Sequence, residues 1–242
     1  MPTKNPGNKP SSTKELIIIS LGGSLLVPES IDDVFVASFK KFIVSHIKKG
    51  YRFILVTGGG KTARNYIESA ATVTKINDED KDWLGIHATR MNAHLVRTIF
   101  REYAHPRINT NPHDLEDFYR ASEPILVAAG WRPGFSTDFD AVVLGKYLGV
   151  KRIINLSNIE RVYDKDPRTH SDARSFDSLH WKEFRKIVGS KWNPGMNVPF
   201  DPIASAMAEK EEMEVAIMNG GDLDNVTRYI AGKKFVGTLI KD

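Results

Sequence analysis

The chain contains no cysteine in its 242 residues. Disulfide bonds, thiolate catalysis and cysteine-ligated zinc are therefore excluded, and a cytoplasmic location is expected because structural disulfides belong to oxidising compartments. The chain also lacks any apolar run that approaches the roughly 20 residues of a membrane-spanning helix, so no membrane association is expected.

Motifs of several common catalytic classes are missing as well. There is no Gly-x-x-x-x-Gly-Lys-Ser/Thr loop of the P-loop enzymes and no Gly-x-Ser-x-Gly nucleophile elbow. The seven histidines show no metal-binding spacing, so no residue is assigned to a metal site. Charge is nearly balanced, with 34 Lys and Arg against 30 Asp and Glu. The formal net charge of +4 favours a weak attraction for anionic substrates and does not indicate nucleic-acid binding.

Composition divides the chain into a short tail and one domain. Residues 1–13 are rich in Pro, Gly, Ser, Thr, Asn and Lys and have no apolar segment, which predicts a disordered tail and not a secretory signal. In residues 14–242, β-branched apolar runs alternate with amphipathic segments of helical spacing. This alternation predicts an α/β fold, a three-layer αβα sandwich with a mostly parallel central sheet.

The same patterns give approximate element boundaries. Strands are expected at 16–21, 51–57, 125–129, 152–156, 213–218 and 235–240, and helices at 34–47, 61–71, 83–103, 139–148, 178–188, 201–211 and 223–231. A polar segment, 74–81, is expected to separate the second helix from the third, and Asn111-Pro112 to open a short helix. Thr137 or Asp138 is expected to cap the helix at 139–148.

Two glycine-rich turns each follow an apolar strand. They are Gly22-Gly23-Ser24 and Gly58-Gly59-Gly60-Lys61. Glycine lets backbone N–H groups approach a ligand closely, and a helix N-terminus favours anions. Two such turns in one domain suggest a site for two phosphorylated groups, as a phosphotransferase needs. The alternative for each turn is a tight strand–helix connection, and for Arg64, one helical turn further on, an ordinary solvated side chain.

Two more polar loops follow predicted strands, at 130–138 and at 157–167. The first mixes glycine, arginine and short hydroxyl side chains that suit a phosphate or a pyrimidine edge, although a turn with an N-cap would need similar residues. The second offers Tyr163 as an aromatic face and carboxylates for a ribose or a metal. Because ligands bind beyond the carboxyl ends of parallel strands, all four loops are expected to converge on one edge of the sheet.

The ordered set of motifs resembles the amino acid kinase superfamily, and within it the UMP kinases of archaeal type. The resemblance covers residues 14–242. It rests on these segments: 21–24, 58–64, 85–93, 133–138, Ser157-Asn158, 162–167, 200–202 and 237–240. It implies transfer of the γ-phosphoryl group of ATP to UMP in pyrimidine nucleotide biosynthesis, with Mg²⁺ carried by ATP. It also implies a homohexamer, with the long helix at 83–103 as a plausible interface.

The resemblance also implies which residues contact each substrate, with the UMP half at roughly 14–150 and the ATP half at roughly 151–242. The ATP contacts would be Gly22, Gly23, Ser24, Gly60, Arg64, Ser157, Asn158, Tyr163 and Asp166. The UMP contacts would be Gly59, Asp82, Gly130, Trp131, Arg132, Pro133, Gly134, Phe135, Ser136 and Thr137. Asp82 would hold the ribose hydroxyls.

Two departures from the family pattern concern charge and backbone. Ser20 stands where many relatives have lysine, so Lys61 is assigned as a catalytic residue together with Arg64, and Arg132 is a second candidate substitute. Glu160-Arg161 replaces the usual Asp-Gly, which disfavours a left-handed turn in the ATP-side loop. Two alternatives stay open: a different phosphotransferase of this superfamily, or a non-catalytic nucleotide- or oxyanion-binding protein on the same fold.

Overall fold

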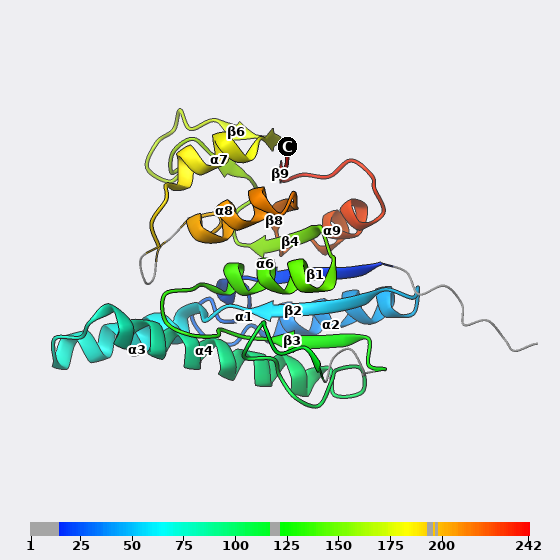
Figure 1. Cartoon of the computed structure of the whole chain (residues 1–242), viewed down its shortest axis with the longest axis horizontal. Coiled ribbons are helices and arrows are strands. Elements are labelled where there is room, and N and C mark those ends of the chain that lie inside the picture. The colour runs from blue at the N-terminus through cyan, green and yellow to red at the C-terminus, as the bar shows by residue number, and fades with distance from the viewer. Residues whose placement is uncertain (1–14, 117–121, 193–195, 197) are drawn as a thin grey trace, which may run out of the picture.

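The structure is a computed structural model that describes residues 15–116, 122–192, 196 and 198–242. The disordered tail predicted at 1–13 lies outside these residues, as does part of the short helix expected after Asn111-Pro112. A seven-stranded sheet runs through the centre of the molecule in the order β3-β2-β1-β4-β8-β9-β7 (Figure 1). Its strands are β1 (Leu16–Leu21), β2 (Arg52–Thr57), β3 (Ile125–Ala128), β4 (Arg152–Ser157), β7 (Ser178–Leu179), β8 (Glu214–Asn219) and β9 (Thr238–Ile240).

The pairing of the strands confirms the expectation of a mostly parallel sheet. The neighbours from β3 to β8 are all parallel, whereas β9 runs antiparallel to β8. The helices are α1 (Gly23–Leu26), α2 (Asp33–Ile47), α3 (Gly60–Val73), α4 (Asp78–Ile99), α6 (Thr137–Leu148), α7 (Trp181–Val188), α8 (Pro202–Lys210) and α9 (Leu223–Ile230). The alternation of strands and helices read from the sequence is therefore present.

Side chains of the central strands point alternately to two apolar layers, because successive residues of a strand face opposite sides of the sheet. Ile17, Ile19 and Leu21 of β1 are buried in one layer, against α2, α4 and α9. Ile18 is buried in the other layer, against α6, α7 and α8. Figure 1 shows α6 on the near side of the central strands. Three layers result, and Ser20, two residues after Ile18, faces the α6 layer.

Several predicted boundaries need correction, most of all that of the long helix. This helix, α4, spans Asp78–Ile99 and not 83–103, because Asn77 caps it by accepting a hydrogen bond from the Asp80 N–H. Residues 78–81 of the supposed polar linker are therefore helical, and Asp82 lies inside the helix. Ser136, and neither Thr137 nor Asp138, caps α6 through its hydroxyl and the Phe139 N–H. The helix expected at 178–188 begins only at Trp181.

One small element was not predicted at all. β5 (Val162–Tyr163) pairs with β6 (Ser175–Phe176) in a two-stranded antiparallel ribbon. The ribbon carries the loop 164–174 and anchors to the main sheet, since the Val162 N–H donates to the Thr238 hydroxyl at 2.9 Å. Strands of two residues leave no measurable alternation in a sequence, so periodicity could not reveal them.

Among the described helices, none combines the length and the apolar character needed to cross a bilayer.

Candidate functional site

A cavity of about 560 Å³ lies where the strand order of the sheet reverses. The chain passes outward from β1 through β2 to β3 and then returns to the other side of β1 as β4. Ligands of open parallel sheets bind beyond the carboxyl ends of the strands at such a point. The cavity lining includes Ser24, Gly59, Gly130 and Asn158, one residue from each of the four predicted loops. The loops therefore converge, as the sequence predicted.

The two glycine turns contact each other through their backbones. A Cβ atom on Gly23 would lie 2.0 Å from the nitrogen of Gly60 and 2.7 Å from the carbonyl carbon of Gly58. A Cβ atom on Gly60 would lie 2.3 Å from the carbonyl oxygen of Gly23, and Gly60 has a φ of +63°. Side chains are thus excluded from Gly23 and Gly60 by steric contact before any ligand binds.

Hydrogen bonds fix each glycine turn to a strand end. The Gly22 N–H donates to the carbonyl of Leu156 at 2.8 Å, and the Gly58 N–H donates to that of Leu21 at 2.9 Å. The first bond joins the β1 turn to β4 across the reversal point, and the second joins the β2 turn to β1. Close packing of the backbone therefore explains why several of these positions are glycine. This is the tight strand–helix connection that the sequence analysis kept as the alternative to a ligand contact. The packing also brings Gly59, Gly60 and the first turns of α3 to the cavity wall.

The 130–138 loop is held from α4. The Asp82 carboxylate accepts from the Gly134 N–H at 2.7 Å, and the Thr89 hydroxyl accepts from the Gly130 N–H at 2.9 Å. Burial raises the pKa of Asp82, while the hydrogen bond from Gly134 opposes that rise. The Gly134 bond engages Oδ2 of Asp82, and Asp82 lines the cavity, so a ligand would meet a carboxylate already oriented by the loop.

Asp138 lies at the junction of β1, β4 and α8. Its side chain accepts from the Ser20 hydroxyl at 2.8 Å, from the Asn155 amide at 3.1 Å and from the Asp201 N–H at 3.2 Å. Burial raises its pKa to about 7, and the nearby charge of Asp201 adds to this, while the Ser20 and Asn155 hydrogen bonds oppose it. Ser20, at the position where the family resemblance implies lysine, is thus a buried hydroxyl that donates a hydrogen bond to a buried carboxyl.

A second buried carboxyl, Asp140, lies two residues further along in the first turn of the same helix, α6. Its Oδ2 accepts from the Trp131 N–H at 3.1 Å, whereas its buried Oδ1 has no hydrogen-bond partner within the described part of the chain. Burial raises the pKa of Asp140 to about 8, although the Trp131 hydrogen bond and the positive charge of Arg90 both oppose this. A proton on Asp140 near neutral pH follows from this environment.

We expect Asp140→Asn to flatten the dependence of stability on pH. The folded-state pKa is about 8 against 3.8 for an ordinary aspartate. The free energy of unfolding that this raised pKa contributes is therefore complete below about pH 4 and is lost as the pH rises through about 8. Relative to the variant, the wild-type protein should lose at least about 1 kcal/mol of unfolding free energy across this range, since one pKa unit corresponds to about 1.4 kcal/mol. Urea unfolding of both proteins at about pH 5 and about pH 8.5 measures the difference. Parallel pH profiles would contradict the expectation.

The cavity brings together ten of the residues that the sequence singled out. They are Ser24, Gly59, Gly60, Arg64, Asp82, Gly130, Phe135, Ser136, Thr137 and Asn158. The other predicted site residues do not line it: Gly22, Gly23, Lys61, Trp131, Arg132, Pro133, Gly134, Ser157, Tyr163 and Asp166. Among these, Gly22, Gly23 and Gly134 belong to the backbone contacts that shape the cavity.

The two candidate substitutes for a lysine at position 20 lie away from the cavity lining. The Lys61 ammonium is 3.9 Å from a carboxylate oxygen of Glu29. The Arg132 guanidinium lies 4.0 Å from the centre of the Trp131 ring and 5.1 Å from that of Phe135. Arg64, in contrast, lines the cavity from the first turns of α3.

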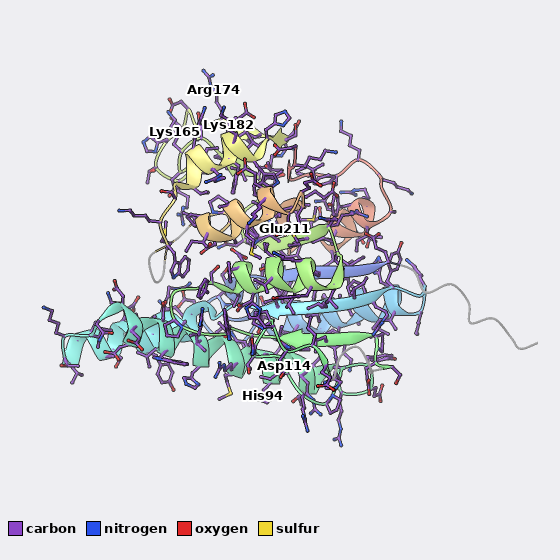
Figure 2. All side chains as sticks on the ribbon, in the orientation of Figure 1. His94, Asp114, Lys165, Arg174, Lys182 and Glu211 are labelled. Carbon is purple, nitrogen blue, oxygen red and sulfur yellow. The ribbon has the colours of Figure 1, made fainter. Side chains whose placement is uncertain are left out.

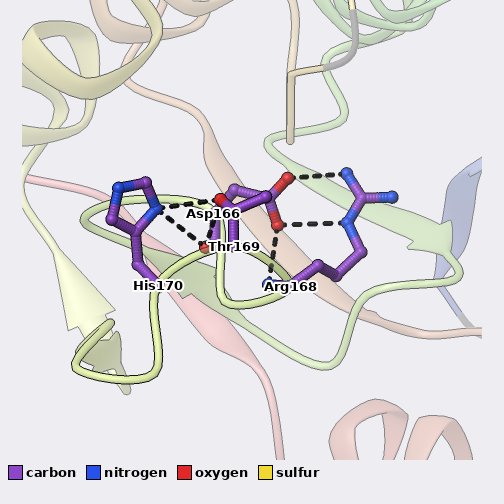
Figure 3. Close-up of polar contacts among 4 residues, drawn as sticks. All are labelled: Asp166, Arg168, Thr169 and His170. Atoms are coloured by element: carbon purple, nitrogen blue, oxygen red, sulfur yellow. Dashed lines mark hydrogen bonds and ion pairs between the residues drawn. The ribbon is translucent and has the colours of Figure 1, made fainter.

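The 157–167 loop reaches the cavity through Asn158, and its continuation does so through Arg168. The Arg168 guanidinium makes a two-point contact with the Asp166 carboxylate, at 3.0 and 2.9 Å (Figure 3). This pair lowers the pKa of Asp166. Figure 2 shows Lys165 and Arg174 pointing outward from the same region, so Arg168 is the residue of this loop that turns a cation toward the cavity.

The substitution at Glu160-Arg161 leaves the backbone in an ordinary conformation. Glu212 is the sole non-glycine residue with positive φ in the described ranges, so Arg161 avoids the left-handed region. Its guanidinium pairs with Asp177. The loop therefore forms with arginine at position 161 and needs no glycine there.

Sequence reasoning missed part of the cavity wall. The lining also includes Ala63, Ile67, Lys81, Gly85, Ile86, Thr89, Arg168, Trp192 and Met196. Gly85, Ile86 and Thr89 lie on α4 within the helix expected at 83–103, whereas Lys81 falls in the segment 74–81 that was taken as a linker. Gly85, Ile86 and Thr89 follow Asp82 at the spacing of one helix face, which is a signal that the sequence already offered. Arg168 follows the unpredicted ribbon and had no such signal.

The fold and the site define an α/β protein with a cavity beside two contacting glycine turns at a strand-order reversal. The amino acid kinase family profile matches residues 15–219, and the chain belongs to this family. The chain is 36% identical to a uridylate kinase of Thermoplasma volcanium over 232 residues, covering 94% of this chain and 98% of the relative. It is 30% identical to a uridylate kinase of Hyperthermus butylicus, covering 93% and 97%. The crystal structure of the Archaeoglobus fulgidus uridylate kinase superposes with a TM-score of 0.79 at 30% identity, covering 93% of this chain and 99% of that one.

Proposed function

We propose that this protein is a UMP kinase, which transfers the γ-phosphoryl group of ATP to UMP and gives UDP and ADP. The observation that carries the proposal is the cavity at the strand-order reversal, where the glycine turns, the 130–138 loop and the ATP-side loop meet. Relatives named uridylate kinase match nearly the whole chain and support the same activity.

The charges of the cavity wall suit two phosphorylated substrates. Among the described residues that line it, Arg64, Lys81 and Arg168 are cationic and Asp82 is the single carboxylate. Phosphoryl transfer needs in-line placement of the reactants and neutralisation of developing charge, with little covalent chemistry from the protein. Arg64 at the start of α3 and the helix N-terminus would stabilise the transferred group. Asp82 would accept hydrogen bonds from the ribose of UMP, whose own phosphate oxygen attacks.

Mg²⁺ would arrive with ATP in this proposal. Within the described ranges, no cluster of three or more His, Asp and Glu side chains has the geometry to hold a metal ion. Mg²⁺ commonly keeps several waters and binds substrate phosphates, so the phosphates of ATP would hold it. When bound there, the ion would neutralise charge on the γ-phosphoryl group.

A coupled assay of ADP release tests the proposal. With ATP and Mg²⁺ present, the rate with UMP should exceed the rates with CMP and dUMP, and far exceed those with acyl and isoprenoid phosphate acceptors. Turnover of one of the latter acceptors in place of UMP would assign a different phosphotransferase activity. Binding of ATP and UMP in calorimetry without turnover would instead identify a non-catalytic nucleotide-binding protein.

We expect Asp82→Asn to raise the KM for UMP more than the KM for ATP. The carboxylate lies at the side of the cavity next to the 130–138 loop, and it can only accept hydrogen bonds when ionised. Losing a charged acceptor should raise the KM for UMP about tenfold, because hydrogen bonds to charged groups contribute about 1.5–3 kcal/mol. Initial-rate kinetics with each substrate varied in turn measure the two values. Equal changes in both would assign Asp82 to the structure of α4.

A homo-oligomer is the second part of the proposal. Tyr66, Val73, Trp83 and Met91, on α3 and α4, are large apolar side chains that stay exposed in the single chain. Figure 1 shows α3 extending beyond the rest of the molecule at one end. Exposed apolar surface of this kind favours association with another subunit. Sedimentation equilibrium of the wild-type protein and of Val73→Asp tests whether this surface is an interface.

A further inference from the structure

The start of the 130–138 loop is fixed by side chains at almost every backbone polar group. The Gly130 N–H donates to the Thr89 hydroxyl at 2.9 Å, and the Trp131 N–H donates to Asp140 Oδ2 at 3.1 Å. The Gly134 N–H donates to Asp82 at 2.7 Å. The loop therefore takes its shape from α4 and α6 and not from hydrogen bonds within itself.

Arg90 completes this arrangement from the carbonyl side. Its Nε donates to the carbonyl of Gly130 at 3.2 Å, and its Nη2 donates to that of Trp131 at 2.9 Å. A guanidinium is a planar group with several N–H donors in a fixed geometry, so it can hold two successive carbonyls in one orientation where an ammonium could not. Two consecutive residues, Gly130 and Trp131, are thus fixed through both their N–H donors and their carbonyl acceptors.

Arg90 and Asp140 both contact the same loop residue, Trp131. The positive charge of Arg90 acts on Asp140, which is buried and holds the N–H of the same residue, Trp131, whose carbonyl Arg90 binds. The two side chains come from different helices, α4 and α6. Trp131 is therefore held by two side chains that come from two different helices. The loop continues from Trp131 to Phe135, Ser136 and Thr137, which line the cavity.

We infer that Arg90 is a positioning residue that sets the affinity for the phosphoryl acceptor by presetting the 130–138 loop. The inference rests on the proposed function, because it assumes that this side of the cavity takes UMP. Arg90 does not line the cavity itself, so its effect passes through the loop backbone. An ordered loop does not lose conformational freedom when the acceptor binds, and this preorganisation strengthens binding.

Three variants test the inference. Arg90→Gln removes the charge and the two-point geometry, and Arg90→Lys keeps the charge but not the geometry. Arg101→Gln is the matched control, because Arg101 is an exposed arginine just beyond the end of α4. Arg90→Gln should raise the KM for UMP about tenfold or more while the KM for ATP changes less than about twofold, as expected when one substrate's binding surface loses its order. Arg90→Lys should fall between the wild type and Arg90→Gln.

Amide hydrogen exchange without nucleotides gives an independent readout. Peptides covering 128–136 should exchange about tenfold faster in Arg90→Gln, whereas peptides from α6 and from the glycine turns should match the wild type, because the release is local.

Each result decides for or against the inference. An unchanged KM for UMP and unchanged exchange in Arg90→Gln would overturn it. Equal rises in both KM values, or faster exchange throughout the protein, would also overturn it by assigning Arg90 to overall stability. A wild-type protein that does not phosphorylate UMP would contradict the proposed function, while the exchange measurement would still show whether Arg90 presets the loop.

Discussion

Replacing Gly23 with alanine should lower the melting temperature and abolish most activity. The new Cβ would lie 2.0 Å from the Gly60 nitrogen and 2.7 Å from the carbonyl carbons of Gly58 and Gly59. These are backbone atoms of a turn that begins α3, so they cannot move aside as a flexible side chain could. Overpacking of this kind costs about 1–3 kcal/mol or more, which for a chain of this size lowers the melting temperature by roughly 2–4 °C per kcal/mol.

Activity should fall further than stability in this variant. The two turns can relieve the clash only by moving apart, and that movement carries Ser24 and Gly60 away from each other in the cavity wall. We expect kcat/KM to fall by at least about a hundredfold, since misplacement of about 1 Å in a reacting geometry has effects of that size.

The matched control for stability is Gly85→Ala. A Cβ on Gly85 would meet no atom within 4 Å, and the residue lies inside α4. Alanine is favoured over glycine in a helix interior by about 1 kcal/mol, so this variant should melt at or slightly above the wild-type temperature. Differential scanning calorimetry of both variants gives the comparison. A Gly23→Ala protein with the wild-type melting temperature and activity would contradict the role assigned to the backbone contact.

The central sheet could be predicted because its strands are buried on both faces. Runs such as 16–19 and 53–56 are continuously apolar and contain β-branched residues, which is typical of parallel strands covered by helices. The order of these strands along the chain shows which loops lie beyond the carboxyl ends of the strands. The convergence of the four loops was therefore also predictable. The close contact of Gly23 with Gly60 was not, because no local pattern shows which two turns will touch.

The less predictable features depend on long-range contacts. Ser20 is buried because the alternation of β1 aims it at α6, and its partner Asp138 is 118 residues away in the chain. The start of α4 was misplaced because the polar residues of its first turn resemble a linker, whereas acidic side chains there complement the positive end of the helix dipole. Arg90 belongs to the motif at 85–93, but its position on a helix does not by itself show that its side chain reaches another loop.

Arg64 and Lys61 offer a direct comparison of two cations on the first turns of α3. Arg64 lines the cavity, whereas the Lys61 ammonium lies 3.9 Å from Glu29. The backbone N–H of Lys61 donates to the Val27 carbonyl at 2.9 Å. The sequence assigned a catalytic role to both residues. The geometry favours Arg64, because a guanidinium that faces the cavity can contact phosphate oxygens at two points.

We therefore expect Arg64→Ala to lower kcat/KM for ATP by about ten- to a hundredfold, which corresponds to the roughly 1.5–3 kcal/mol of a charge-assisted contact. Arg64 is exposed at the cavity wall, so its removal should leave the melting temperature unchanged, and circular dichroism checks that the variant is folded. Lys61→Met should change kcat by less than about threefold, since Lys61 pairs with Glu29 and does not line the cavity. If Lys61→Met instead lowers kcat sharply and Ser20→Lys restores part of the loss, Lys61 supplies the charge that the family resemblance implies at position 20. Unchanged kinetics in a folded Arg64→Ala protein would exclude Arg64 from the site and leave Arg168 and Mg²⁺ to neutralise the transferred phosphoryl group.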